Sequence, residues 1–285
     1  MDTNNRASEQ AMLPTTTNYG TSVTSSTKDG SSSNAGGVWR FTDIGQVGER
    51  SRDGSPHATD EVFNGASHMA ATMMSILGMV LLVSQSSALG APWKIVSFSI
   101  YGTSLIFLFA CSTLHHSISG SEQLESFLKM LDYLAIYPLI AGTFTPLCLV
   151  PFHNSTVGWS FCAVVWFLAI LGMVFTYRMH EGIPKWLSMT TYLTLGWLGA
   201  LMSYWLWEAL GSGGMALFVL GGVFYTVGGY VYTTEKPNPV PGSFGFHEIW
   251  HVAVMLGAGT HWFLMFIYVL PWEASATAAA VAADR

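Results

Sequence analysis

The chain has 285 residues, of which 51% are hydrophobic and only 10% are charged. That charged fraction is far below the roughly 25% that is usual in soluble domains, which argues against a soluble fold. Only 11 Lys and Arg residues stand against 17 Asp and Glu, giving a formal net charge of −6, so no basic surface is available and we expect no nucleic-acid partner.

The first 57 residues differ in composition from everything that follows. Stretches such as TSVTSSTKDGSSSNAGG are rich in Ser, Thr, Asn and Gly and have no apolar period. We therefore predict a disordered N-terminal tail over residues 1–57, a membrane domain over 58–272 and a short C-terminal tail over 273–285. The N-terminus has no basic stretch followed by an apolar one, so we expect no cleavable signal peptide.

From residue 61 onward, long apolar stretches alternate with short polar breaks. A helix needs about 20 mostly apolar residues to cross a bilayer. The stretches that are long enough are residues 61–84, 94–116, 127–150, 157–177, 186–209, 214–233 and 246–270. The sequence therefore predicts an all-α integral membrane protein, built as a bundle of seven transmembrane helices that crosses its membrane several times.

The distribution of Lys and Arg predicts the orientation of this bundle. Most basic residues near the span ends fall on the side of the N-terminus, and few fall on the opposite side. The first set is Arg50, Arg52, Lys129, Arg178, Lys185 and Lys236, and the second is Lys94 and Arg285. Since cytoplasmic loops carry the excess of Lys and Arg, we expect the N-terminus in the cytoplasm and the C-terminus outside.

This orientation brings polar residues of four spans to one membrane depth, near the cytoplasmic face. Ionisable residues inside spans are energetically costly and are functional candidates by default. The residues concerned are Glu61, Asn64 and His68 in the first span, Ser112, His115 and His116 in the second, Asp132 in the third, and His247, Glu248 and His251 in the last.

The histidines of this set have the spacing of metal ligands. His247 and His251 are four residues apart, so both imidazoles leave one face of a helix and can bind one ion. Ser112 and His116 repeat this spacing in the second span, which supplies a third histidine. Three neutral imidazoles with one open position are typical of a catalytic Zn²⁺ site. Asp132 is then placed to hold the zinc-bound water or to orient a ligand.

A different interpretation is that HEIWH matches HExxH, the metalloprotease helix with two zinc ligands and a glutamate base. The longer HExxHxxGxxH pattern fails, because Val254 stands at its glycine and Gly257 at its third histidine. Glu248 also points about 100° away from the two-histidine face. An intramembrane protease therefore stays as an alternative only.

The remaining polar residues are expected to support the bundle. Glu61, Asn64 and His68 follow one stripe of the first span, which predicts a polar brace facing the bundle, with His68 also a metal candidate. His261 lies ten residues beyond His251, roughly 15 Å along a helix, so it cannot share the same coordination shell. We expect it to hydrogen-bond with neighbouring helices.

Four ordered segments of the chain resemble the hemolysin III family, which belongs with the progestin and adipoQ receptors. They are EVFNGASH, FACSTLHHS, LDYLAIYPLIAGTFTP and FGFHEIWHVAVMLGAGTHW, and the resemblance covers residues 61 to about 270. It implies seven helices, an inside N-terminus and a zinc ion held by three histidines near the cytoplasmic face. By position, the family motifs fall on Ser112, His116, Asp132, His247 and His251. His115 departs from the family pattern, which usually has an aromatic residue there.

Two functions follow from these observations. The first is zinc-dependent hydrolysis of a ceramide-like lipid amide, with Asp132 as base or water orienter and Ser112 supporting the oxyanion or the metal. The second is a seven-helix receptor or regulatory protein whose zinc is structural. Membrane lipids are the expected partners in both cases. The resemblance spans receptors, weak amidases and bacterial cytolysins, and the sequence does not choose among them.

Overall fold

The structure is a computed structural model that describes residues 61–179 and 182–273. The predicted tail over residues 1–57 lies outside these residues, as does nearly all of the predicted tail over 273–285. Within the described part the chain is helical, and an isolated bridge between Val240 and Phe244 is the one β-type pairing there. The prediction of an all-α fold is confirmed for this part of the chain.

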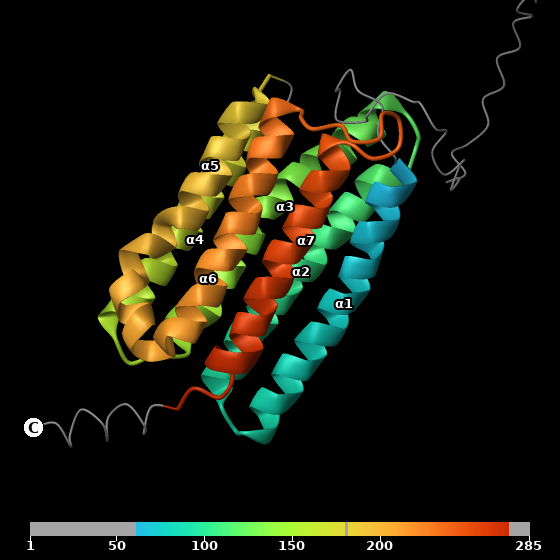
Figure 1. Ribbon diagram of the computed structural model, residues 1–285. Coiled ribbons are helices and arrows are strands. Elements are labelled where there is room, and N and C mark those ends of the chain that lie inside the picture. The colour runs from blue at the N-terminus through green and yellow to red at the C-terminus, as the bar shows by residue number, and fades with distance from the viewer. Residues whose placement is uncertain (1–60, 180–181, 274–285) are drawn as a thin grey trace, which may run out of the picture. The chain divides into compact units, whose positions relative to one another are not determined.

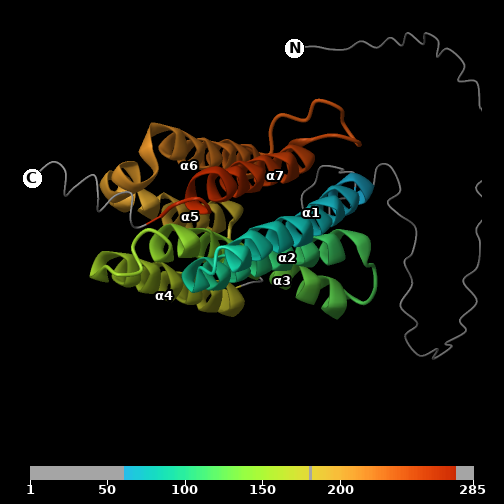
Figure 2. The same cartoon turned by 90° about the horizontal axis from the view of Figure 1, so that it is seen from below.

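The helices run nearly parallel or antiparallel to one another (Figure 1). They are α1 (Glu61–Ala88), α2 (Pro92–Ser117), α3 (Glu122–Leu149), α4 (Thr156–Met179), α5 (Lys185–Trp197), the 3₁₀ turn η1 (Leu198–Met202), α6 (Ser203–Thr234), α7 (Phe246–Leu264) and the π-helical turn η2 (Met265–Val269). Helices α1 to α4 pack in chain order, and α6 packs against α7 (Figure 2).

Six helical segments among the described residues are long and apolar enough to cross a membrane. One of them, Lys185–Thr234, has 50 residues and folds back on itself. Gly211 interrupts α6 with a φ of 66°, a conformation that glycine adopts without a steric penalty. Trp197 Nε1 then donates to Thr226 Oγ1 across the two arms at 3.0 Å. The interruption lies between the predicted spans 186–209 and 214–233.

Local sequence signals explain where the helices begin and how their ends are joined. Ser121 caps α3 by accepting a hydrogen bond from the Leu124 backbone N–H at 3.3 Å. Pro92 is the first residue of α2, where a missing N–H costs nothing. Two residues later, the buried Lys94 Nζ donates to the Leu270 carbonyl at 2.6 Å. This bond connects the start of α2 to the end of η2.

The outer faces of the bundle are apolar. Met73 and Met74 of α1 are 68% and 67% exposed, and Phe167 of α4 is 61% exposed. In contrast, Tyr101 of α2 and Tyr137 of α3 are fully enclosed. Large apolar side chains on the perimeter would be a liability in water but are what lipid tails require. The interior is therefore formed mainly by α2, α3 and the faces of α6 and α7 that turn toward them.

Candidate metal centre

Three buried histidines from two helices meet at one end of the bundle. They are His116 near the end of α2 and His247 and His251 at the start of α7, and their ligand nitrogens lie within 4.8 Å of one another. The Nε2 atoms of His247 and His251 are 3.1 Å apart. In tetrahedral sites with metal–nitrogen bonds of about 2.0–2.1 Å, two ligand nitrogens lie about 3.3 Å apart. The donor set and its spacing therefore fit one metal ion.

A second group of donors shares His116 with the first. His115, His116 and Asp132 also offer ligand atoms within 4.8 Å of one another. Asp132, about three turns into α3, is partly buried, and the Ser112 hydroxyl of α2 is close enough to interact with its carboxyl group. The structure thus brings all five sequence-predicted site residues together. It places His115 beside Asp132 and outside the group that contains His247 and His251.

Glu248 lies between the two α7 histidines in the sequence, but its hydrogen bonds serve to hold the start of α7 in place. Its Oε2 accepts a hydrogen bond from the Gly245 backbone N–H at 2.7 Å, which caps the first turn of α7. Its Oε1 accepts from Asn64 Nδ2 of α1 at 3.2 Å. Glu248 belongs to neither group of candidate ligands. The HExxH match therefore reflects a capped helix start at this position.

Helix α1 contributes three polar side chains to the same place. Glu61 Oε2 lies 2.5 Å from His116 Nδ1, and Asn64 binds Glu248 as described. The His68 ring stacks on the His251 ring, with centroids 3.8 Å apart, and neither nitrogen of His68 has a hydrogen-bond partner. The predicted polar brace is confirmed by these contacts. The pairing of Glu61 with a candidate ligand was not predicted, although metal-binding histidines commonly contact a carboxylate.

A cavity of about 300 Å³ extends from this centre between α3, α5, α6 and α7. Ser112, Asp132, His247 and His251 line one end of it. Farther from the metal centre, the walls of the cavity are mainly apolar and include Ile136, Ile140, Phe144, Leu193 and Val254. His261 lines the far end, about four helical turns along α7 from His247, or roughly 21 Å.

His261 behaves as the sequence predicts. Its Nε2 lies 3.1 Å from the Phe218 carbonyl of α6, and its ring stacks on the Phe218 ring. It belongs to neither group of candidate ligands. The neighbouring Thr260 bonds to its own helix, donating to the Leu256 carbonyl at 2.7 Å. His261 therefore joins α6 to α7 at a distance from the metal centre.

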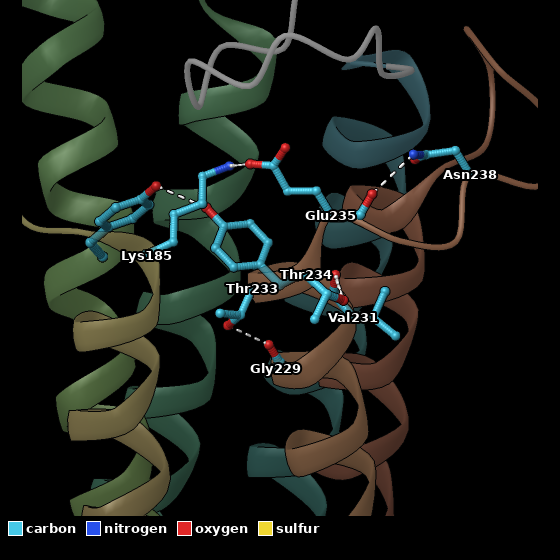
Figure 3. A network of polar contacts seen from close by, with 9 residues as sticks. Lys185, Gly229, Val231, Thr233, Thr234, Glu235 and Asn238 are labelled. Atoms are coloured by element: carbon cyan, nitrogen blue, oxygen red, sulfur yellow. Dashed lines mark hydrogen bonds and ion pairs between the residues drawn. The ribbon is translucent and has the colours of Figure 1, made fainter.

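Charged and aromatic side chains also line the cavity, among them Lys185, Tyr133 and Tyr232. Figure 3 shows the polar contacts around Lys185 and Glu235. Lys185 Nζ lies 3.2 Å from the Glu235 carboxylate and 4.9 Å from the centre of the Tyr232 ring. The Tyr232 hydroxyl lies 3.0 Å from that of Tyr133 on α3. Asn238 Nδ2 donates to the Glu235 carbonyl at 3.0 Å, as Figure 3 also shows. No feature of the sequence pairs these residues, because the contacts depend on how α5 and α6 fold back.

Several known proteins are similar to this chain over more than half of its length. The profile of a family described as Haemolysin-III related matches residues 57–262. The chain is 35% identical over 209 residues to the Hemolysin-3 homolog of Bacillus subtilis, a match that covers 73% of this chain and 94% of that protein. It is 26% identical over 222 residues to the human Monocyte to macrophage differentiation factor, covering 75% and 86% of the two chains. It is 29% identical over 201 residues to Heptahelical transmembrane protein 4 of Arabidopsis thaliana, covering 62% and 49%.

The matched region contains every residue of the candidate metal centre. It also contains nearly all of the helical segments that are long and apolar enough to span a bilayer. The chain is therefore an integral membrane protein that crosses its membrane more than once. The resemblance carried by the four sequence motifs is confirmed, and the chain belongs to the haemolysin-III related family.

Proposed function

We propose that this chain is a zinc-dependent membrane hydrolase that cleaves a ceramide-like lipid amide near the cytoplasmic face. One observation carries the proposal: three buried imidazoles converge beside Asp132 at the polar end of an otherwise apolar cavity. Neutral imidazoles in a tetrahedral arrangement suit Zn²⁺. Three protein ligands leave one position for a water or a substrate, which is the arrangement of catalytic sites.

The proposed topology has seven crossings. A straight helix over Lys185–Thr234 would be about 75 Å long, whereas the hydrocarbon core of a bilayer is about 30 Å thick. The contact between Lys185 and Glu235 brings the two ends of this segment together, so we assign it two crossings. The name of the heptahelical relative from Arabidopsis thaliana agrees with that number. The positions of Lys129 and Lys185 beside the metal centre support a cytoplasmic location for this end.

The residues around the centre suit amide hydrolysis. A zinc ion bound there would acidify a water molecule and polarise the amide carbonyl. The Asp132 carboxylate would accept the proton of the attacking water and deliver it to the nitrogen of the leaving amine. The Ser112 hydroxyl, beside Asp132, would orient that carboxylate. The apolar walls would bind the acyl chain and keep bulk water out.

The cavity also suits an amphiphilic substrate. Its volume of about 300 Å³ is at the lower end of ligand sites, which span about 300–1,000 Å³. Its length of roughly 21 Å along α7 gives it an elongated form with one polar end. An acyl chain directed toward His261 would leave its amide group next to His247 and His251.

The test is to measure zinc content and fatty acid release from ceramide with purified full-length protein. We expect about one zinc per chain and release that stops on chelation. His116→Ala, His247→Ala and His251→Ala should each lose zinc and turnover, whereas His261→Ala should retain zinc. Asp132→Asn should keep zinc and lose turnover. Absence of zinc from the intact protein would contradict the proposal.

A structural zinc in a receptor or regulatory protein is the second candidate. The backbones of α2 and α7 have little contact with each other, whereas each of these helices packs against α1. An ion that joins His116 to His247 and His251 would therefore add a link between two helices with little other contact. In that case Asp132→Asn should leave signalling unchanged, and removal of zinc should mainly lower the melting temperature.

A further inference from the structure

We propose that Glu61 is the positioning residue of the metal centre. Its carboxylate holds Nδ1 of His116, which directs the other ring nitrogen toward His247 and His251. The inference rests on the proposed metal site and extends that site to α1, none of whose residues belongs to the two groups of candidate ligands. It assigns a role to a membrane glutamate that the reaction itself does not use.

The contact has the features of an orienting hydrogen bond. Glu61 Oε2 and His116 Nδ1 are 2.5 Å apart, and the side chains are only 6% and 1% exposed. A carboxylate can only accept, so Nδ1 is the nitrogen that carries the proton. The lone pair of the ring is then on Nε2, which is the form of histidine that binds an ion through that atom. Glu61 thus selects both the tautomer and the ring orientation.

The position of Glu61 is fixed by two contacts of α1 with the ligand-bearing helices. Gly65 lies one turn after Glu61, and a Cβ there would be 2.6 Å from Ser117 Oγ and 3.8 Å from His116 Cβ. A Cβ at this position would require the Ser117 hydroxyl to move, and any larger side chain would meet the His116 backbone, so the small residue lets α1 approach α2 closely. Asn64 fixes α1 to α7 by donating to Glu248. The carboxylate therefore enters the site from a rigidly placed helix.

The other carboxylates at this end have different partners. Glu248 accepts from the Gly245 backbone and from Asn64, and Asp132 lies with His115 and Ser112. A simple ion pair between Glu61 and a protonated His116 is the competing explanation. A protonated His116 must lose its proton before it binds an ion, so loss of the carboxylate would then leave metal affinity unchanged or raise it. The two explanations therefore differ in what loss of the carboxylate does to metal affinity.

The experiment titrates metal-free, full-length protein with Zn²⁺ and with Co²⁺, whose visible absorption reports ligand geometry. Glu61→Gln should lower zinc affinity about 10–100-fold and change the cobalt spectrum. Glu125→Gln is the control, because it removes the same charge at the same end of the bundle from a carboxylate that accepts from the Gly120 backbone N–H at 3.2 Å and belongs to neither group of candidate ligands. It should retain the affinity and spectrum of the wild type. Equal affinity and an equal spectrum for Glu61→Gln would overturn the proposal.

A second pair of variants tests the inference if Glu61→Gln does not fold. Gly65→Leu should push α1 away from α2 and weaken zinc binding, because its side chain would extend past the Cβ position toward His116 and Ser117. Gly259→Leu is its control, because a Cβ at Gly259 meets nothing within 4 Å. Wild-type affinity in Gly65→Leu would refute the role of α1. Metal binding without hydrolysis in the wild type would refute the hydrolase and leave Glu61 in place, whereas a wild type that binds no metal would refute both.

Discussion

Glu248→Gln distinguishes a structural glutamate from a catalytic one. The Glu248 carboxylate accepts hydrogen bonds from the Gly245 N–H at 2.7 Å and from Asn64 Nδ2 at 3.2 Å. Each hydrogen bond to a charged group contributes about 1.5–3 kcal/mol. Glutamine keeps one acceptor oxygen but presents an NH₂ group to the other donor. One bond is therefore lost and the other becomes neutral, which lowers the free energy of unfolding by about 2–3 kcal/mol.

For a protein of this size, that loss corresponds to a melting temperature lower by about 5–10 °C. Thermal unfolding in detergent, followed by tryptophan fluorescence, measures it, with zinc content and lipid hydrolysis recorded on the same samples. Zinc and turnover should be preserved, since Glu248 belongs to neither group of candidate ligands. Glu208→Gln on the exposed surface of α6 is the control and should change the melting temperature little. A Glu248→Gln variant with unchanged stability and abolished hydrolysis would refute this reasoning and favour an HExxH-type base.

Three further predictions concern the topology, the tail and the packing. A tag at the N-terminus should be cytoplasmic and one after Trp272 should be outside; protease protection of both tags on one side would contradict seven crossings. Deleting residues 1–55 should leave zinc content unchanged, and loss of zinc on truncation would contradict the predicted domain division. Gly172→Ala should lower stability by about 1–3 kcal/mol, because its Cβ would lie 2.2 Å from the buried Tyr137 ring. Unfolding in detergent measures this loss, and a melting temperature equal to that of the wild type would exclude the expected clash.

The sequence was sufficient for the helical segments but not for their ends. Apolar length and polar breaks predict α1, α2, α4 and α7 to within a few residues. The predicted spans 186–209 and 214–233 instead fall in one segment, Lys185–Thr234, which Gly211 interrupts between them. The 3₁₀ turn η1 and the π-helical turn η2 were not predicted. Such turns depend on how a chain end packs against its neighbours, and that information is absent from local hydropathy. The contact between Lys185 and Glu235 was missed for the same reason.

For the site residues, the sequence predicts how deep each one lies in the membrane but not how each helix is rotated about its own axis. The order of the spans and the charges at their ends place residues at a height in the membrane, which was enough to gather His116, Asp132, His247 and His251. The rotation of each helix about its axis follows from packing contacts such as the close approach at Gly65. That rotation determines that Glu61 faces His116 and that His68 stacks on His251. These contacts could therefore be seen only in the structure.

The bond between Lys94 and Leu270 bears on how positive charge is divided between the two ends of the bundle. Lys94 is buried and its ammonium group faces the last carbonyl groups of the α7–η2 segment, where a cation is favourable. The other basic residues of the described chain are Lys129, Arg178, Lys185 and Lys236, which belong to the loops and helix ends on the side of the metal centre. In the proposed topology these residues face the cytoplasmic leaflet, where each would contribute about 1 kcal/mol of attraction to anionic lipids. Neutralising Lys94 would remove its bond to the Leu270 carbonyl and leave this attraction unchanged.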